Sequence, residues 1–364
     1  MDFTLGEELE EVRGLARQIF TDYATADRLR AAEQSGSGVD DGLWKALGDA
    51  GLLGIALPEE DGGAGLGVGG LCVLLEEQGR TVAPAPVWPA LVAGLTIAKH
   101  GDAAQREALL PGLAEGAERV TVALEEFSPA DPADPRCSAV PDGDGWRLTG
   151  VKAVVPSAVG AKYVLVTART ESGPGVFVVE ASAPGTEWEW TRTTTHDAAG
   201  NLTLEGVPAR ALGEGALRTI LDLTRVAVTA VQAGVADGAM RLAASYLSER
   251  EQFGRPLATF QAVQHQLADT YIEIEAMQAC LWKAVSLLEA GEDAAAAALT
   301  AKWWADEGGL NAVHRAQHLH GGIGVDVDYP MHRYFLWGKQ LSGVLGGASA
   351  DLAELGDLLA GAAS

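Results

Sequence analysis

The stretch SEREQFGRPLATFQAVQHQLAD, residues 248–269, decides the fold because it marks a corner between two long helical patterns. We predict that the first helix ends at Phe253 and Gly254, where glycine suits the left-handed position after a helix. A proline then prevents simple continuation, and a second helical pattern follows. Arg250 and Gln252 offer a planar cation and an amide beside the aromatic face, a set that suits a pyrophosphate and a purine ring. A capped helical hairpin closed by an ion pair is the alternative interpretation.

A different pattern precedes this corner. Between about 120 and 212, short β-branched runs such as KYVLVTART alternate with Pro, Gly and Asp clusters, which predicts a small antiparallel β domain. Before residue 120, runs such as LGEELEEVRGLARQIFTDYA place apolar residues at three- and four-residue steps. We therefore expect an α+β fold with a helical, a β and a second helical domain, over residues 1–120, 121–212 and 213–364. In the last domain, long helices are predicted at 215–249, 257–290, 293–318 and 346–361.

Composition excludes several classes of function. The 364 residues carry a net charge of −24 and a sequence pI of about 4.6, which argues against partners such as nucleic acid or an anionic membrane surface. No apolar run approaches the roughly 18 residues of a membrane span, and the acidic start is unlike a signal peptide. Cys72, Cys137 and Cys280 lack ligand-like spacing, which indicates reduced thiols in a cytoplasmic protein.

A second informative stretch is AQHLHGGIGVDVDYPMHRYF, residues 316–335. Gly321, Gly322 and Gly324 allow the backbone to turn sharply, so that amide N–H groups can approach an anionic group closely. We therefore expect this turn to form part of a cofactor site.

The histidines of the same region raise the alternative of a metal site. His314 and His318 are four residues apart on one helix face, and His320 is close by. The nearby carboxylates, Asp326 and Asp328, lie on a loop without a zinc-like pattern, and the region has no cysteine. We therefore predict no metal.

Four motifs together resemble the acyl-CoA dehydrogenase family. LWKALGDAGLLGIALPEEDGGAGLG, HGDAAQREALLPGLAEG, SEREQFGRPLATFQAVQHQLAD and HLHGGIGVDVDYPMHRYF occur in the family's order, and the resemblance covers nearly the whole chain. It implies a helical domain, a β domain and a C-terminal four-helix bundle, with FAD at a subunit interface.

The resemblance also implies which residues contact FAD from the C-terminal domain. The family's R-x-x-F-G corner contacts the FAD of the neighbouring subunit, and the next apolar residue adds a contact. A Q-x-x-G-G motif meets the pyrophosphate, with histidine in place of glutamine in this chain. These motifs fall on Arg250, Gln252, Phe253, Leu257, His318, Gly321 and Gly322.

The β domain departs from the family pattern. The family's T-E-P-x-A-G-S-D and W-I-T/S stretches hold the flavin ring and the thioester, whereas this chain has ALEEFSPADPAD (123–134) and KAVVPSA (152–158). The small residues, the threonine and the tryptophan are missing, although Ser157 can still donate one hydrogen bond. We therefore expect no flavin ring to be held by this β domain.

The resemblance finally implies a reaction that this chain is not equipped to complete. The family removes the α proton of an acyl thioester while a hydride leaves Cβ for the flavin, and a glutamate acts as the base. That glutamate has two known positions, which fall on Gly346 in LGGAS and Thr224 in LDLTRV. Asp222 is close to the second position but is turned by about 200° around a helix.

Three hypotheses follow from these vacant positions. The first is a base-less subunit that works with a homologous, glutamate-bearing subunit, as in the actinobacterial α2β2 acyl-CoA dehydrogenases of steroid side-chain degradation. The second is a self-sufficient homotetramer with a relocated base, such as Glu249 or Asp351. The third is a non-enzymatic acyl-CoA-binding or scaffold protein of the same fold.

Overall fold

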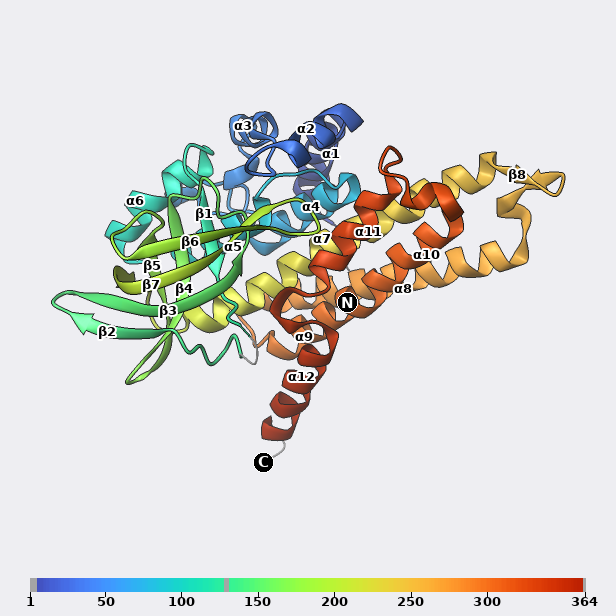
Figure 1. The fold of residues 1–364 in the computed structure, drawn as a ribbon. Coiled ribbons are helices and arrows are strands. Elements are labelled where there is room, and N and C mark those ends of the chain that lie inside the picture. Colours follow the sequence, from blue (N-terminus) through green and yellow to red (C-terminus); the bar gives the residue numbers. More distant parts are fainter. Residues whose placement is uncertain (1–4, 128–130, 363–364) are drawn as a thin grey trace. The chain divides into compact units, whose positions relative to one another are not determined.

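The computed structural model describes residues 5–127 and 131–362, which form two compact units (Figure 1). The helical unit consists of Met1–Ala26, Cys72–Ala83 and Arg225–Ser364, and the β unit consists of Asp27–Leu71 and Pro84–Thr224. Both units are assembled from separate stretches of the chain, so the domain boundaries at 120 and 212 stay predictions.

The β unit begins with short helices, and capping residues mark the start of two of them. Asp40 caps one of them by accepting a hydrogen bond from the Leu43 N–H at 3.0 Å. Asp102 and Gln105 form a capping box at another. The helices from Ala26 to Ala114 are α2 (Ala26–Gln34), α3 (Asp41–Asp49), α4 (Gly67–Thr81, which also enters the helical unit), α5 (Val87–His100) and α6 (Ala103–Ala114).

A seven-stranded sheet fills the rest of the described β unit, with the order β1-β4-β2-β3-β7-β5 and β6 paired to β7. Most pairs are antiparallel as predicted, but β1 and β2 both run parallel to β4, which corrects the expectation of a purely antiparallel domain. The chain reaches β4 only after the β2–β3 hairpin, a crossover that leaves the two strands parallel. The strands are β1 (Val120–Ala123), β2 (Ser138–Asp142), β3 (Gly145–Val155), β4 (Tyr163–Thr170), β5 (Gly173–Glu180), β6 (Thr186–Arg192) and β7 (Ala198–Ala211).

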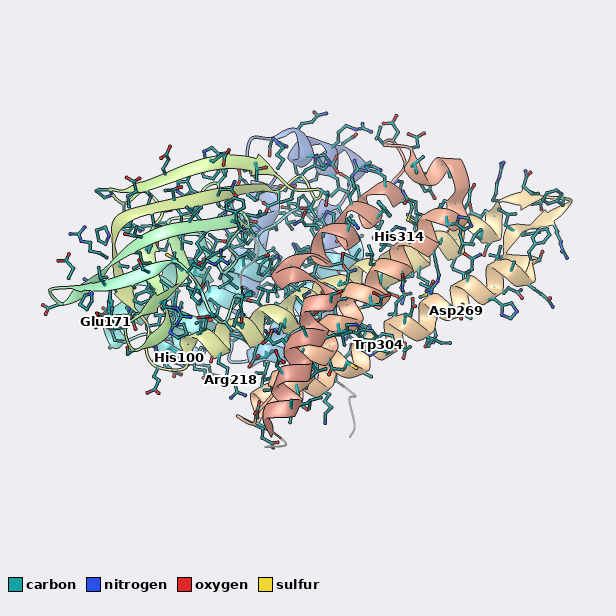
Figure 2. The ribbon with its side chains drawn as sticks, turned by 60° about the horizontal axis from the view of Figure 1, so that its bottom comes forward. His100, Glu171, Arg218, Asp269, Trp304 and His314 are labelled. Carbon is teal, nitrogen blue, oxygen red and sulfur yellow. The ribbon has the colours of Figure 1, made fainter. Side chains whose placement is uncertain are left out.

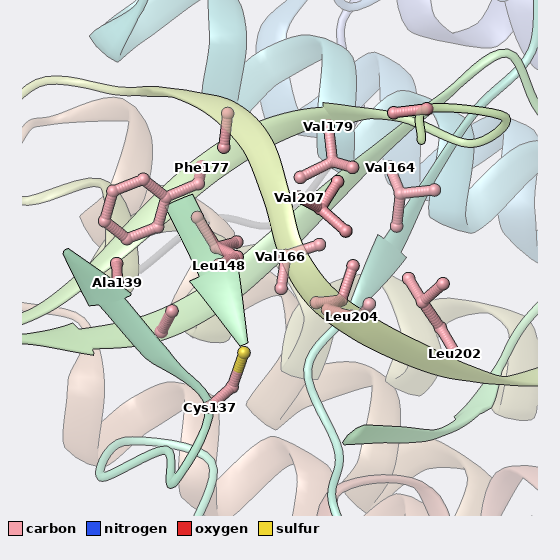
Figure 3. Packing of buried hydrophobic residues seen from close by; sticks show 14 of the residues in the cluster. Cys137, Ala139, Leu148, Val164, Val166, Phe177, Val179, Leu202, Leu204 and Val207 are labelled. Carbon is pink, nitrogen blue, oxygen red and sulfur yellow. The ribbon is translucent and has the colours of Figure 1, made fainter. Parts of the chain in front are cut away.

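Alternating apolar side chains from several strands meet in one core (Figure 3). Val164 and Val166 of β4 point into it together with Leu202 and Leu204 of β7, as the two-residue period of a strand requires. Phe177 of β5 is buried in the same cluster. This core fixes the register of the sheet, because a shift by one residue would turn the apolar side chains outward.

The register of β3 and β7 positions one part of the candidate site. A register shift between Lys152 and Val155 leaves Val154 with φ of 47°, and Val155 pairs with Gly200. The residues that follow β3 therefore lie beside those that precede β7.

The helical unit is built around α8 (Gln261–Glu289) and the part of α7 (Ala216–Glu249) from Arg225 onward. A small hairpin joins the C-terminal end of α7 to the N-terminal end of α8 (Figure 1). The predicted helix at 293–318 is interrupted by a π-helical turn, Ala305–Gly309. The other helices of the unit are α1 (Glu7–Tyr23), α9 (Ala295–Trp304), α10 (Leu310–His320), α11 (Met331–Leu341) and α12 (Ala348–Ala362). The joining hairpin consists of β8 (Glu251–Gln252) and β9 (Arg255–Pro256). Short 3-10 turns of the helical unit span Leu257–Thr259, Gly321–Val325 and Val344–Gly346, and those of the β unit span Leu52–Gly54 and Glu59–Asp61.

One helix corrects the expectation that no segment approaches a membrane span. Ala216–Glu249 is long and apolar enough by length and composition, but 94% of its most apolar window is buried inside the protein. A helix that is enclosed on all sides must be apolar on all sides, so the pattern belongs to a core helix.

Candidate functional site

The hairpin between α7 and α8 carries the first group of predicted residues. The helix ends at Glu249, in agreement with the predicted range 215–249, and not at the cap predicted at Phe253 and Gly254. Those two residues instead form the turn of the hairpin, with φ of 56° and 76°. Two left-handed residues are the geometry of a type I′ turn, so glycine here serves a hairpin and not a helix cap.

Phe253 is the most exposed large apolar side chain of the described residues. Its exposed fraction is 90%, and its ring makes one edge contact with Phe260 at 6.1 Å between centroids. The Arg255 guanidinium lies 4.0 Å from the centre of the Phe260 ring and supports that side of the hairpin. A left-handed conformation costs a non-glycine residue about 1–3 kcal/mol, and such strain is characteristic of ligand contacts. The turn therefore presents an aromatic ring to the solvent.

Arg250, Gln252 and Leu257 lie on the same hairpin. The Leu257 N–H donates to the Arg250 carbonyl at 2.9 Å, and the Gln252 amide donates to the neighbouring Glu251 carbonyl. Arg250 and Gln252 are exposed, and Arg250 takes part in none of the ion pairs of residues 5–127 and 131–362. This finding disfavours the interpretation as a hairpin closed by an ion pair. We call residues 250–257 the hairpin tip.

The glycine turn after α10 lies at the same end of the helical unit. The His320 ring stacks on Tyr246 of α7 at 4.7 Å and contacts Tyr329 at 5.3 Å. Gly321 follows with φ of 64° and ψ of −142°, a conformation that favours glycine. Added Cβ atoms at Gly321 and Gly322 would meet no atom within 4 Å, so the backbone here is open to a ligand. The aromatic stack thus places the start of the glycine turn beside the last turns of α7, which lead into the hairpin tip.

His320 is a positioning residue whose role the sequence does not reveal, since its spacing suggests only a metal ligand. Its Nδ1 is bonded to the Ala316 carbonyl at 2.7 Å, and its Nε2 is buried without a partner. Burial lowers the pKa of His320, so the ring is neutral at physiological pH. His318, the predicted FAD residue, is exposed on the last turn of the same helix. The Gln317 amide donates to the Gly324 carbonyl at 3.1 Å and closes the turn.

The histidines that suggest a metal site have other neighbours in the structure. The His314 ring packs edge-on against Phe335 at 4.8 Å. Within the described ranges, no three His, Cys, Asp or Glu side chains are grouped so that they could hold a metal ion.

The two base positions have different surroundings. Thr224 is fully buried in α7, and its hydroxyl donates to the Ile220 carbonyl at 2.6 Å. Gly346 is exposed and has φ of 97°, and an added Cβ would lie 2.9 Å from the Ala350 Cβ. The first position is therefore filled by the core, and the second has a backbone that rejects a side chain.

The carboxylates that could serve as relocated bases also differ. Asp351 is buried in the first turn of α12 and faces Lys302 at 3.9 Å, inside the helical unit. Glu249 is exposed at the last residue of α7, next to the hairpin tip. Asp222 is buried and lies 3.7 Å from Arg218. Of these groups, Glu249 is the one with open access.

In the β unit, the first divergent stretch forms an internal ion pair. Glu126 accepts hydrogen bonds from the backbone N–H groups of Arg136 and Cys137, and it contacts the buried Lys152 Nζ at 2.6 Å. Lys152 also donates to the Thr167 hydroxyl at 2.9 Å. This part of 123–134 therefore serves the fold. Residues 128–130 of the stretch lie outside the described residues.

The second divergent stretch is closed by a carboxylate. The Ser157 N–H and hydroxyl donate to the two Asp197 oxygens at 2.8 and 3.0 Å. Burial raises the pKa of Asp197 to about 6, although both bonds favour the charged form. The one hydroxyl donor noted in this stretch is thus engaged by the chain itself.

Comparisons with known proteins identify the relatives of this fold. The profile "Acyl-CoA dehydrogenase, N-terminal domain" matches residues 6–117, and "Acyl-CoA dehydrogenase, C-terminal domain" matches residues 213–350. The chain belongs to the acyl-CoA dehydrogenase family. Acyl-CoA dehydrogenases are FAD-dependent oxidoreductases. The sequence is 35% identical to acyl-CoA dehydrogenase FadE27 of Mycobacterium tuberculosis (strain ATCC 25618 / H37Rv), over 99% of each chain.

Two solved structures are similar over the whole length. A chain of the Tcur3481-Tcur3483 steroid ACAD G363A variant has 69% identity and a TM-score of 0.97, covering 99% of this chain and 100% of that chain. A chain of the ChsE4-ChsE5 complex from Mycobacterium tuberculosis has 34% identity and a TM-score of 0.94, covering 99% of each chain. The predicted order of helical, β and helical domains in the acyl-CoA dehydrogenase fold is confirmed.

Proposed function

We propose that this acyl-CoA dehydrogenase family member is the base-less subunit of a heteromeric enzyme. It holds FAD through its C-terminal residues and works with a homologous subunit that carries the catalytic glutamate. An α2β2 heterotetramer in the cytoplasm is the assembly that we infer.

The observation that carries the proposal is the state of the two base positions. A buried threonine hydroxyl bonded to Ile220 cannot accept a proton at neutral pH, and Gly346 has no side chain to do so. Moreover, the Gly346 backbone is left-handed, so a glutamate there would be strained. The family's reaction needs a positioned base. A partner subunit that carries the glutamate meets that need.

The residues present fit FAD on one side only. Arg250 and Gln252 supply donors for a pyrophosphate, Phe253 supplies a ring face, and the open Gly321–Gly322 backbone supplies amide groups. FAD held by these residues would supply the acceptor for the hydride that leaves Cβ of the acyl thioester. In the β unit, Asp197 presents negative charge and takes the Ser157 hydroxyl, an arrangement that does not fit an incoming flavin ring. We infer that this chain grips the phosphates and adenine end of a cofactor whose ring is held by the partner.

The names of two solved relatives support a choice of partner class and substrate class. One solved relative is named a steroid ACAD with two components, and the other is a ChsE4-ChsE5 complex. We propose that this chain likewise pairs with a different acyl-CoA dehydrogenase subunit and that the complex oxidises a steroid-CoA side chain.

Co-expression tests the proposal directly. The full chain purified alone is expected to bind little FAD and to show no dehydrogenation of acyl-CoA. Co-expression with a glutamate-bearing homologue is expected to give yellow, active protein. Activity and a flavin spectrum from the chain alone would reject the proposal, and absence of flavin in every pairing would favour the non-enzymatic scaffold.

The self-sufficient alternative has its own test. Glu249 is the accessible candidate for a relocated base, so Glu249→Gln should abolish any activity of the lone chain under that hypothesis. Under our proposal, the same substitution leaves the activity of the co-expressed complex near the wild-type value. Exposed Glu275 on α8 offers a matched control, Glu275→Gln.

A further inference from the structure

The helical unit contains a buried charged cluster that takes no part in the sites above. Lys302 lies on α9, Asp306 on the π-helical turn and Asp351 in the first turn of α12, with exposed fractions of 0%, 3% and 2%. The Lys302 Nζ lies 2.5 Å from both Asp306 oxygens and 3.9 Å from Asp351. The π-helical turn begins directly after Trp304, which Figure 2 labels. One ammonium group therefore joins α12 to the continuous segment that α9 and the π-helical turn form.

The charges in the cluster do not balance unless one proton is bound. Two carboxylates and one ammonium leave a net charge of −1 in a buried place, which is unfavourable. Burial raises the pKa of Asp306 to about 8 and also raises that of Asp351. Furthermore, Asp351 Oδ2 is buried without a hydrogen-bond partner. A proton shared by the two carboxyl groups removes both problems at once.

A second ion pair fastens the same face of α12. The Arg225 guanidinium of α7 is bonded to both Glu354 oxygens at 2.7 and 2.6 Å. Glu354 follows Asp351 by three residues, so the two side chains lie on one face of the helix. In the described chain, the charged groups that act on the cluster are thus Arg225 from α7, Lys302 from α9, Asp306 from the π-helical turn, and Asp351 with Glu354 from α12.

The backbone before α12 depends on this fastening. Leu345, Gly346 and Gly347 have φ of 58°, 97° and 77°, so three successive residues have positive φ. The N–H groups of Ala350 and Asp351 donate to the Gly347 carbonyl at 2.9 and 3.1 Å. Whatever holds Asp351 in place therefore also fixes the conformation at Gly346.

We propose that Lys302, Asp306 and Asp351 form a proton-dependent clamp that fixes α12 and the 345–347 segment ahead of it. With the shared proton bound, the cluster is neutral and α12 is held. Loss of the proton leaves a buried negative charge, and α12 detaches more often. Because Asp306 binds its proton more tightly in the closed state, the clamp is strongest at low pH and weakens as pH rises from the ordinary aspartate range to about 8.

Hydrogen–deuterium exchange of the full chain tests the clamp. In peptides that cover 348–362, protection corrected for intrinsic exchange should fall by up to about tenfold per pH unit and level off above pH 8. Asp306→Asn keeps a donor and an acceptor but cannot titrate, so protection should stay high and lose its pH slope. Asp351→Asn is expected to do the same if the first variant folds poorly. Asp61→Asn, which alters the ion pair with Arg106 in the β unit, should keep the wild-type slope in α12.

Two outcomes would overturn the clamp. The first is wild-type protection of α12 that does not change between pH 6 and 9. The second is a pH slope that persists in both aspartate variants. Neither outcome bears on FAD binding, because Lys302, Asp306 and Asp351 are not among the residues that we assign to FAD.

Discussion

The hairpin tip and the Ser157–Asp197 pair use their polar groups in opposite ways. At the tip, the Arg250 and Gln252 side chains are exposed, and Phe253 is 90% exposed. Phe253 also has a left-handed backbone, which lowers the stability of the isolated fold. At the end of β3, Asp197 satisfies the Ser157 N–H and hydroxyl at 2.8 and 3.0 Å. In our proposal, the tip groups are left exposed for an external ligand, whereas the Ser157–Asp197 pair serves the internal structure of the β unit.

Removing the tip arginine should have the largest effect on the cofactor and almost none on the fold. Arg250→Ala deletes charge-assisted hydrogen bonds to a pyrophosphate, worth about 1.5–3 kcal/mol, so the Kd for FAD of the co-expressed complex should rise about 10- to 100-fold. Since the side chain is exposed, the thermal midpoint should stay within error. Flavin fluorescence titration measures the first quantity and calorimetry the second.

A surface arginine supplies the matched control for that prediction. Arg30→Ala on α2, which is also exposed, should leave FAD affinity unchanged. Equal losses in the two variants would mean that the tip has no special role.

Breaking the Ser157–Asp197 pair should lower the stability of the fold and leave FAD affinity almost unchanged. Asp197→Ala leaves the Ser157 donors without an acceptor, which should lower the free energy of unfolding by about 1–3 kcal/mol. FAD affinity of the complex should stay within about twofold, because this stretch does not hold the cofactor in our proposal. A large gain or loss of flavin in this variant would show that the β unit still has a cofactor role.

The hairpin tip could be predicted from the sequence, whereas the Ser157–Asp197 pair could not. The tip residues are contiguous, so the motif at 250–257 is sufficient to place them together. In contrast, Ser157 and Asp197 are 40 residues apart, and their pairing depends on the register that sets Val155 opposite Gly200. The stack of His320 on Tyr246 likewise depends on how α7 packs beside α10.

Local signals also have more than one structural meaning. Glycine after Phe253 serves equally as a helix cap or as part of a type I′ turn, so the predicted cap at this position is wrong although the helix range 215–249 is right. α11 is absent from the predicted helices because it follows a loop rich in glycine, histidine and aspartate, residues that usually indicate a turn. The long patterns of α7 and α8 are reliable because they repeat over many turns.

The β-unit pair also predicts a pH dependence that the tip does not share. The pKa of Asp197 is raised to about 6 in the folded state, so its contribution to stability is greatest below the ordinary aspartate pKa and declines as pH rises through about 6. The total decline should be about 3 kcal/mol. Asp197→Asn should flatten this part of the profile, as measured by denaturant unfolding at several pH values. A slope of unchanged size would assign the effect to another group.

The smallest effect should come from the turn residue itself, and it tests both halves of the comparison at once. Phe253→Gly removes the strain of a left-handed side chain, so the free energy of unfolding, measured with denaturant, should rise by about 0.5–1 kcal/mol. The same change removes the exposed ring, and FAD affinity of the complex should fall. Phe260→Leu, which alters the supporting ring but leaves the turn strain in place, serves as the control and should show no such gain in stability. If glycine raised stability without weakening FAD binding, the exposed ring would have no function that explains its strain.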